Sequence, residues 1–323
     1  MPDTMVRGES FSGCAVSCRP VPGLRLALLV CALAAPFFAP SSAYAVPFVD
    51  RGIVPDPLSR RIEGEGGFLQ SSSGWGEFSN YLASSDGEHA WDAKLGASVE
   101  VFRLRNLWSV DIGSDVELVA IPNDDIHFKP RVFYWQESLF VMRRWKAVDW
   151  GIGYYHRCRH DIDNLDEYEM FNGEKLERVC IYDSVTLRAY PDPIGWNWGG
   201  GASGSARLTL DEHAYVLRQD SFDNSGADPL TLNNLLDTVA LGLETEPFRR
   251  GMVGWYLNFK EYTDIYNSGG LVLSADILAE TGLRFHGAGA AFDVFLRFEH
   301  FAETLMDPWR QEGDYLSLGL RLE

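Results

Sequence analysis

Residues 108–120 read WSVDIGSDVELVA, a stretch in which apolar and polar side chains alternate. Trp108 and Ile112 fall on the even positions, and Asp111 and Asp115 fall on the odd ones. Successive side chains of a β-strand point to opposite faces of the sheet, whereas a helix would spread these charges around its circumference. The stretch therefore predicts a β-strand with one apolar face and one acidic face.

The same alternation recurs along the chain. We find twelve such runs, from 61–71 to 313–323, and among the clearest are 251–263, 270–285 and 289–301. Several runs continue for 11 to 15 residues, beyond the ~5–6 typical of soluble sheets and within reach of the ~9–11 that a tilted membrane-spanning strand needs. The predicted fold class is all-β, an antiparallel transmembrane β-barrel of about 12 strands.

The connections between the runs differ in length, as in outer-membrane barrels with short periplasmic turns and longer extracellular loops. Tight turns are expected at 105–106, 146–147, 191–193, 246–249 and 287–289. Longer polar loops are expected near 72–90, 122–128, 161–176, 211–230, 264–269 and 302–312. Gly199 to Gly201 are expected inside a strand, 197–210, where glycine eases close packing or a bend.

The N-terminal segment has the plan of a secretory signal peptide. Arg19 and Arg25 lie before an apolar run that ends at Phe38, and small residues follow up to Ala45, where cleavage is expected. Pro36 interrupts the run and leaves it short of the ~20 apolar residues that a membrane anchor needs. We therefore expect export to the outer membrane of a Gram-negative bacterium, with a signal peptide over 1–45, a periplasmic segment over 46–60 and the barrel over 61–323.

The charge balance excludes one class of partner. Of the 28 basic and 46 acidic residues, three basic and two acidic ones lie in 1–45, which leaves 25 against 44 and a net charge of −19. Such a surface repels nucleic acid. The partners expected are outer-membrane lipids and the machinery that assembles barrels, and the sequence does not set an oligomeric state.

A soluble alternative fits the alternation equally well. A secreted β-sandwich or a lipocalin-like barrel would turn the apolar faces inward and the charged faces to water. The signal peptide, the aromatic residues at strand ends such as Trp108, Trp145 and Trp150, and the unequal connections favour the membrane barrel.

In a membrane barrel the charged faces line the lumen. About 12 strands leave a narrow interior, and opposite charges close it by pairing, so a wide pore is not expected. The side chains expected inside are Asp111, Asp115, Glu117, Asp276, Arg284, Asp293, Arg297 and Glu299.

Only two of the five cysteines, Cys158 and Cys180, lie outside the signal peptide. An even pair in an exported chain predicts a disulfide. The two residues are equally distant from Glu169, so a hairpin centred there would place them directly opposite each other.

The segment between these cysteines is acidic. The spacing of Asp161, Asp163 and Asp166 is similar to that of a calcium-binding loop, but the required glycine and the closing glutamate are absent. A solvated acidic loop is the default interpretation, and a divalent cation bound in the 161–169 loop is the alternative. No other cofactor is expected.

Residues 153–163 read GYYHRCRHDID and carry the chemistry-bearing side chains of the chain. Here the sequence resembles a family of bacterial outer-membrane barrels of unknown function that have a Tyr-His-x-Ser-x-His-type motif. The resemblance extends through 132–136, 242–244 and the region from Arg297 to Leu320. It implies a barrel and a location, and it implies no reaction.

The motif also resembles outer-membrane phospholipase A and the lipid A deacylase barrels. Those enzymes use a His and a Ser two residues apart on one strand, facing lipid at the outer leaflet. Residues i and i+2 share a face, so a base and a nucleophile can meet there. The resemblance implies His156 as the base and places Cys158 where the serine would be.

Two hypotheses remain open. The first is a barrel without enzymatic activity, with a structural role or transport through a narrow lumen. The second is an outer-leaflet lipid hydrolase, phospholipase or lipid A deacylase-like, that uses His156.

Overall fold

The computed structural model describes residues 66–85, 89–105, 107–121, 130–162, 179–221, 230–301 and 313–323. Thirteen strand segments and one 3₁₀ turn make up this part of the chain. They are β1 (Gly66–Ser84), β2 (Trp91–Leu104), β3 (Trp108–Ala120), β4 (Pro130–Trp145), β5 (Val148–Asp161), β6 (Cys180–Pro191), β7 (Ile194–Gly199), β8 (Ala202–Asp220), η2 (Leu232–Asn234), β9 (Leu235–Arg250), β10 (Val253–Asn267), β11 (Leu271–His286), β12 (Ala291–Phe301) and β13 (Gly313–Leu322).

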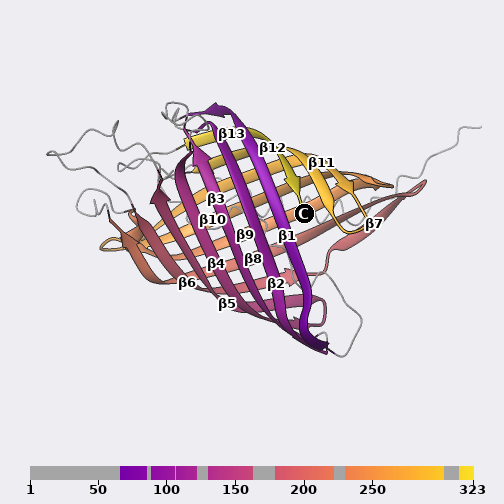
Figure 1. The fold of residues 1–323 in the computed structure, drawn as a ribbon, viewed down its shortest axis with the longest axis horizontal. Helices are drawn as coiled ribbons and strands as arrows, with labels where there is room; N and C mark the ends of the chain where they lie inside the picture. The colour runs from indigo at the N-terminus through magenta and orange to yellow at the C-terminus, as the bar shows by residue number, and fades with distance from the viewer. Residues whose placement is uncertain are drawn as a thin grey trace, which may run out of the picture. The chain divides into compact units, whose positions relative to one another are not determined.

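The strands form one closed antiparallel barrel. Apart from β6 and β7, strands consecutive in sequence are neighbours in the sheet, and β1 pairs with β13, with Glu77 opposite Arg321. The first and last strands, indigo and yellow, lie side by side in Figure 1. Because β6 and β7 both pair with β8, they share one position, so thirteen segments make twelve strand positions.

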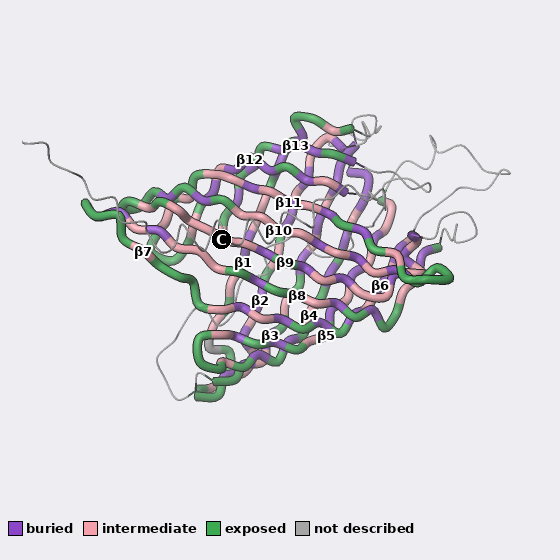
Figure 2. Tube along the Cα trace, turned by 180° about the vertical axis from the view of Figure 1, so that it is seen from behind, coloured by how far each residue is buried: buried purple, intermediate pink, exposed green. Residues whose placement is uncertain are grey.

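Burial alternates along every long strand, as the purple and green segments of Figure 2 show. On β11, Leu271 and Leu273 are 73% and 54% exposed, whereas Ser274 and Asp276, at the even positions that follow, are 5% and 0% exposed. Apolar side chains thus cover the outside and charged ones fill the inside. A soluble barrel has the reverse arrangement, so this is an outer-membrane barrel and the predicted fold class and location are confirmed.

No helix among the described residues is long and apolar enough to cross a membrane.

Two predicted turns are wrong because the chain passes through their prolines without reversing. The expected turn at 246–249 belongs to β9, where the register skips between the pairs Trp255–Phe248 and Leu257–Thr245. Pro247 falls in the skipped stretch and gives up no ladder hydrogen bond there. The turn itself comes later, at Gly251 and Met252.

The expected turn at 191–193 is likewise only an interruption between β6 and β7. The chain reverses at Gly200 and Gly201, whose φ angles of 60° and 79° suit glycine far better than other residues. The glycines expected inside a strand therefore make a hairpin turn, and β8 begins after them, at Ala202.

Three expected loops are partly strand. β1 continues to Ser84 through the expected 72–90 loop, β8 continues to Asp220 and β10 continues to Asn267. These stretches are rich in serine, glycine and charged residues, so their apolar alternation is weak. Their backbone pairing with neighbouring strands supplies the order that their side chains do not indicate.

The outward face of β11 gives the first prediction. Ala275→Arg places a charge among Leu271, Leu273 and Ile277 on the lipid side, and we expect a loss of ~2–4 kcal/mol of stability. Ala288→Arg, in the exposed turn after β11, is the matched control and should cost less than ~0.5 kcal/mol. Urea unfolding in lipid vesicles measures both, and equal losses would contradict the assigned facing.

Candidate functional site

All eight predicted lumen residues lie on the inner wall. Seven are at most 9% exposed, and the eighth, Arg284, has a side chain that is 24% exposed. What distinguishes them from ordinary surface charges is their pairing. Burial of a charge is costly unless a counter-charge and hydrogen bonds compensate it.

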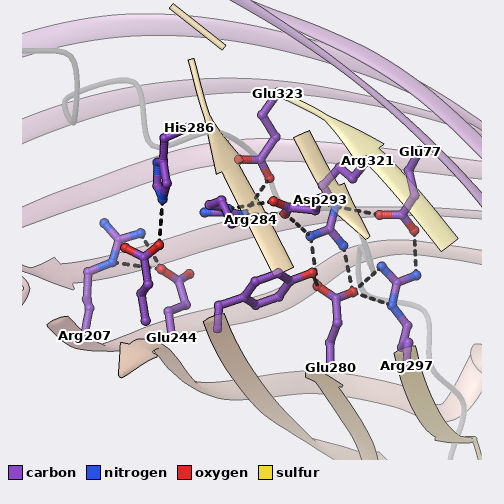
Figure 3. Close-up of polar contacts among 12 residues, drawn as sticks. Glu77, Arg207, Glu244, Glu280, Arg284, His286, Asp293, Arg297, Arg321 and Glu323 are labelled. Carbon is purple, nitrogen blue, oxygen red and sulfur yellow. Dashed lines mark hydrogen bonds and ion pairs between the residues drawn. The ribbon is translucent and has the colours of Figure 1, made fainter. Parts of the chain in front are cut away.

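The densest network joins the seam of the barrel, and Figure 3 shows it. Arg297 of β12 reaches Glu77 of β1 and Glu280 of β11, each at 2.6 Å. Arg321 of β13 bonds the same two carboxylates at 2.8 and 2.7 Å and also approaches Asp293. Two guanidiniums thus share two carboxylates across four strands, and Arg284 continues the chain of charges to Asp293 at 2.6 Å.

A second network crosses β2, β3 and β5. The Lys94 ammonium lies 3.3 Å from Glu117 and 3.7 Å from Asp92, and Arg157 donates to Glu117 at 2.8 Å. These side chains are all nearly inaccessible to solvent. The ionic networks therefore occupy the interior rather than lining an open channel.

The extracellular end of the interior is closed by apolar and aromatic groups. Leu232 and Leu235, in and after η2, are fully buried and pack in one cluster with Tyr155, Tyr215 and Tyr266 from three strands. Residues 230–234, directly before β9, therefore fold into the barrel at this end. Together, the charges and this cluster fill the interior with the protein's own side chains.

On the outer wall, three polar residues lie on one rung of the sheet. His156 of β5 stands directly opposite Glu137 of β4 on one side and opposite Asp183 of β6 on the other. We call Glu137, His156 and Asp183 the polar row. The His156 Nδ1 atom lies 2.5 Å from the Asp183 Oδ1 atom, and their side chains are 28% and 14% exposed.

Apolar residues border the polar row above and below. Toward the β5–β6 connection, the next outward rung holds Trp135, Cys158 and Ile181. The next outward rung toward the periplasmic turn holds Leu139, Tyr154 and Val185. Trp135 donates its indole N–H to Glu137 at 3.2 Å, and Tyr154 is hydrogen-bonded to Asp183.

The predicted disulfide is wrong. Cys180 stands opposite Arg159, and Cys158 stands opposite Ile181, so the two cysteines are one residue out of register and point to opposite faces. Cys158 faces outward as a free thiol, two residues from His156 on the same face. Cys180 is buried in the interior cluster with Tyr155 and Tyr182.

Of the three aspartates considered for a divalent cation, only Asp161 lies within the described residues. It ends β5 on the inner wall, where Arg131 and Arg159 each reach it at 2.8 Å. The Asp161 carboxylate is therefore paired with two guanidinium groups. Asp163 and Asp166 lie outside the described residues, and within them no group of three or more His, Cys, Asp or Glu side chains is arranged to hold a metal ion.

Sequence reasoning found His156 and Cys158 but missed Asp183 and Glu137. The sequence does contain a signal for both residues. Each interrupts an outward apolar series, Glu137 between Trp135 and Leu139 and Asp183 between Ile181 and Val185. The pairing register, which brings both to His156, was not readable from the separate strands.

Comparisons with solved structures return membrane barrels. The β domain of the Bordetella autotransporter BrkA shares 9% identity over 78% of this chain and 98% of its own, with a TM-score of 0.43. LpxR from Salmonella typhimurium shares 8% over 78% and 99%, with a TM-score of 0.40. The outer membrane phospholipase A from Escherichia coli shares 12% over 77% and 92%, with a TM-score of 0.43.

No family model matches the chain, and no curated protein matches its sequence. Sequence identities of 8–12% and TM-scores of 0.40–0.43 to proteins with such different names carry no information on the activity of this protein.

The seam network gives a second prediction. Arg297→Met leaves Glu77 and Glu280 buried with less counter-charge, and we expect it to destabilise the barrel by ~3–5 kcal/mol. Arg207→Met removes a pair with Glu244, whose side chain is 41% exposed, and should cost at most ~1 kcal/mol. Thermal unfolding in detergent compares the two variants, and similar losses would show that the network adds no stability.

The filled interior gives a third prediction. In planar bilayers the purified barrel should conduct little more than the bilayer without protein. Any residual current should favour cations, because carboxylates outnumber arginines among the predicted lumen residues. A large, stable, anion-selective conductance would show that the interior opens.

Proposed function

We propose that this protein is a lipid acyl hydrolase of the outer membrane whose active site is on the outer wall of the barrel. The observation that carries the proposal is the His156–Asp183 pair, at 2.5 Å, with Cys158 on the same face of the same strand. An imidazole oriented by a carboxylate, next to a potential nucleophile, is the arrangement that activates a hydroxyl or thiol for acyl transfer.

The position of the pair supports a role in chemistry rather than in folding. Ionisable groups that face lipid are costly, and membrane proteins keep them where they act on a substrate or an ion. The inner wall already contains paired networks that stabilise the barrel, so the polar row adds nothing that the fold requires. Apolar replacements would suit the bordering residues Trp135, Leu139 and Val185 better.

The pair assigns a role to each atom. An ionised Asp183 only accepts hydrogen bonds, so Nδ1 of His156 carries the proton between them and Nε2 is left as the base. Nε2 takes the proton of the Cys158 thiol, and the thiolate attacks the ester carbonyl of a lipid. The C–S bond forms, the C–O bond breaks, and the departing alcohol receives the proton from His156.

Water completes the reaction. His156 removes a proton from water, the hydroxide attacks the thioester carbonyl, and the C–S bond breaks. The fatty acid leaves and the thiolate regains the proton from His156. Tyr154 is also hydrogen-bonded to Asp183, which helps to fix the carboxylate beside the imidazole.

The interior supports the same conclusion by a different argument. Ionic networks and the cluster around Leu232 and Leu235 occupy the lumen, so passage of a solute would require them to rearrange. The outer wall, by contrast, is in contact with lipid, which is the proposed substrate.

The test is hydrolysis of phospholipid in mixed micelles by the purified barrel. We expect His156→Ala to abolish activity, Asp183→Asn to lower it by ~10²–10⁴-fold and Cys158→Ala to abolish it. Cys158→Ser should retain a measurable part, because a hydroxyl can replace the thiol.

His300→Ala is the matched control. His300 also faces outward with a carboxylate, Asp314, at 2.8 Å, but the residue two positions after it in the sequence is Ala302, which has no nucleophile. Its removal should leave activity unchanged. Absence of hydrolysis in the parent protein, or activity that survives His156→Ala, would refute the proposal and leave a structural barrel as the remaining function.

A further inference from the structure

We infer that the polar row selects lipids whose headgroup carries an ammonium group, and that Glu137 and the Trp135 ring recognise it. The inference rests on the proposed function and names its substrate class. It decides between two lipids that the hydrolase hypothesis leaves open, an ammonium-bearing phospholipid and a polyanionic glycolipid of the lipid A type.

Glu137 brings an additional negative charge to the polar row. Asp183 is already engaged with Nδ1 of His156, so Glu137 is a second carboxylate on the other side of the same imidazole. Glu137 is exposed on the outer wall. A neutral indole N–H at 3.2 Å satisfies one of its lone pairs but does not balance its charge.

An exposed aromatic side chain lies beside that carboxylate. Trp135 is 45% exposed and lies two residues from Glu137 on the same outward face of β4. Phe133 packs edge-on against it, with ring centroids 6.3 Å apart and an interplanar angle of 86°. An exposed indole ring next to a carboxylate is the combination that binds ammonium groups, through cation–π attraction and charge pairing.

The described strands around the polar row offer little positive charge to an anionic lipid. Among the described outward residues of β3 to β6, the one basic side chain other than histidine on the strands is Arg143, near the periplasmic end of β4. A lipid with several phosphates would therefore meet the carboxylates of Glu137 and Asp183, whose charge has the same sign, and this disfavours its binding.

The experiment compares two phospholipids with identical acyl chains, and lipid A, in mixed micelles at low salt. Phosphatidylethanolamine carries the ammonium group, phosphatidylglycerol carries the same phosphate without it, and lipid A carries phosphates alone. We expect hydrolysis of the first to exceed that of the second by about fivefold, which corresponds to ~1 kcal/mol for one exposed ion pair. Lipid A should be the poorest substrate.

Glu137→Gln should reduce the preference to within about twofold while hydrolysis continues. Glu261→Gln is the matched control, since Glu261 also faces outward but lies on β10, away from the row. It should leave the preference unchanged. Equal rates on the two phospholipids, or a preference that survives Glu137→Gln, would overturn the inference while the hydrolase proposal stands.

A binding measurement separates the two proposals. The inactive His156→Ala barrel is purified from nanodiscs with equal amounts of the two phospholipids, and the lipid retained is measured by native mass spectrometry. Retained phosphatidylethanolamine should exceed phosphatidylglycerol, and Glu137→Gln in the same background should remove the excess. If this holds but the parent protein hydrolyses nothing, the recognition stands and the reaction is refuted; equal retention refutes the recognition.

Discussion

The rest of the structure depends on one constraint, which is that the outer wall of the barrel faces lipid. Hydrocarbon offers no hydrogen bonds, so every backbone group must be satisfied within the sheet and the sheet must close. The pairing of β1 with β13 achieves this closure. Once the outer face is apolar, the charged half of each alternating strand is turned inward, and there only opposite charges make its burial tolerable.

The same constraint explains why the polar row indicates a function. On the inner wall, charged residues are numerous and paired, and none of them by itself suggests an activity. On the outer wall, Glu137, His156 and Asp183 interrupt an apolar surface that the membrane would otherwise favour. A carboxylate, an imidazole and a second carboxylate side by side in that position make a site where lipid is both the surrounding solvent and the substrate.

Period-two alternation was sufficient to predict the barrel, its strand number and the facing of residues such as Asp276 and Leu273. It was insufficient where proline and glycine decide the path of the backbone, because Pro247 fits a bulge as well as a turn and Gly200 fits a turn as well as a strand. For the site, His156 and Cys158 could be found from their spacing. The disulfide prediction failed because it required a register, and a shift of one residue turns a side chain to the other face.

The ion pairs at the seam also bear on how the barrel assembles. Glu77 is in the first strand, and its partners Arg297 and Arg321 are in the last two, more than 200 residues away along the chain. These contacts can form only when β13 meets β1. A slip of one residue at that meeting would move Glu77 to the lipid side and leave both arginines with less counter-charge inside. The seam network therefore penalises misaligned closure and favours the one register in which insertion ends.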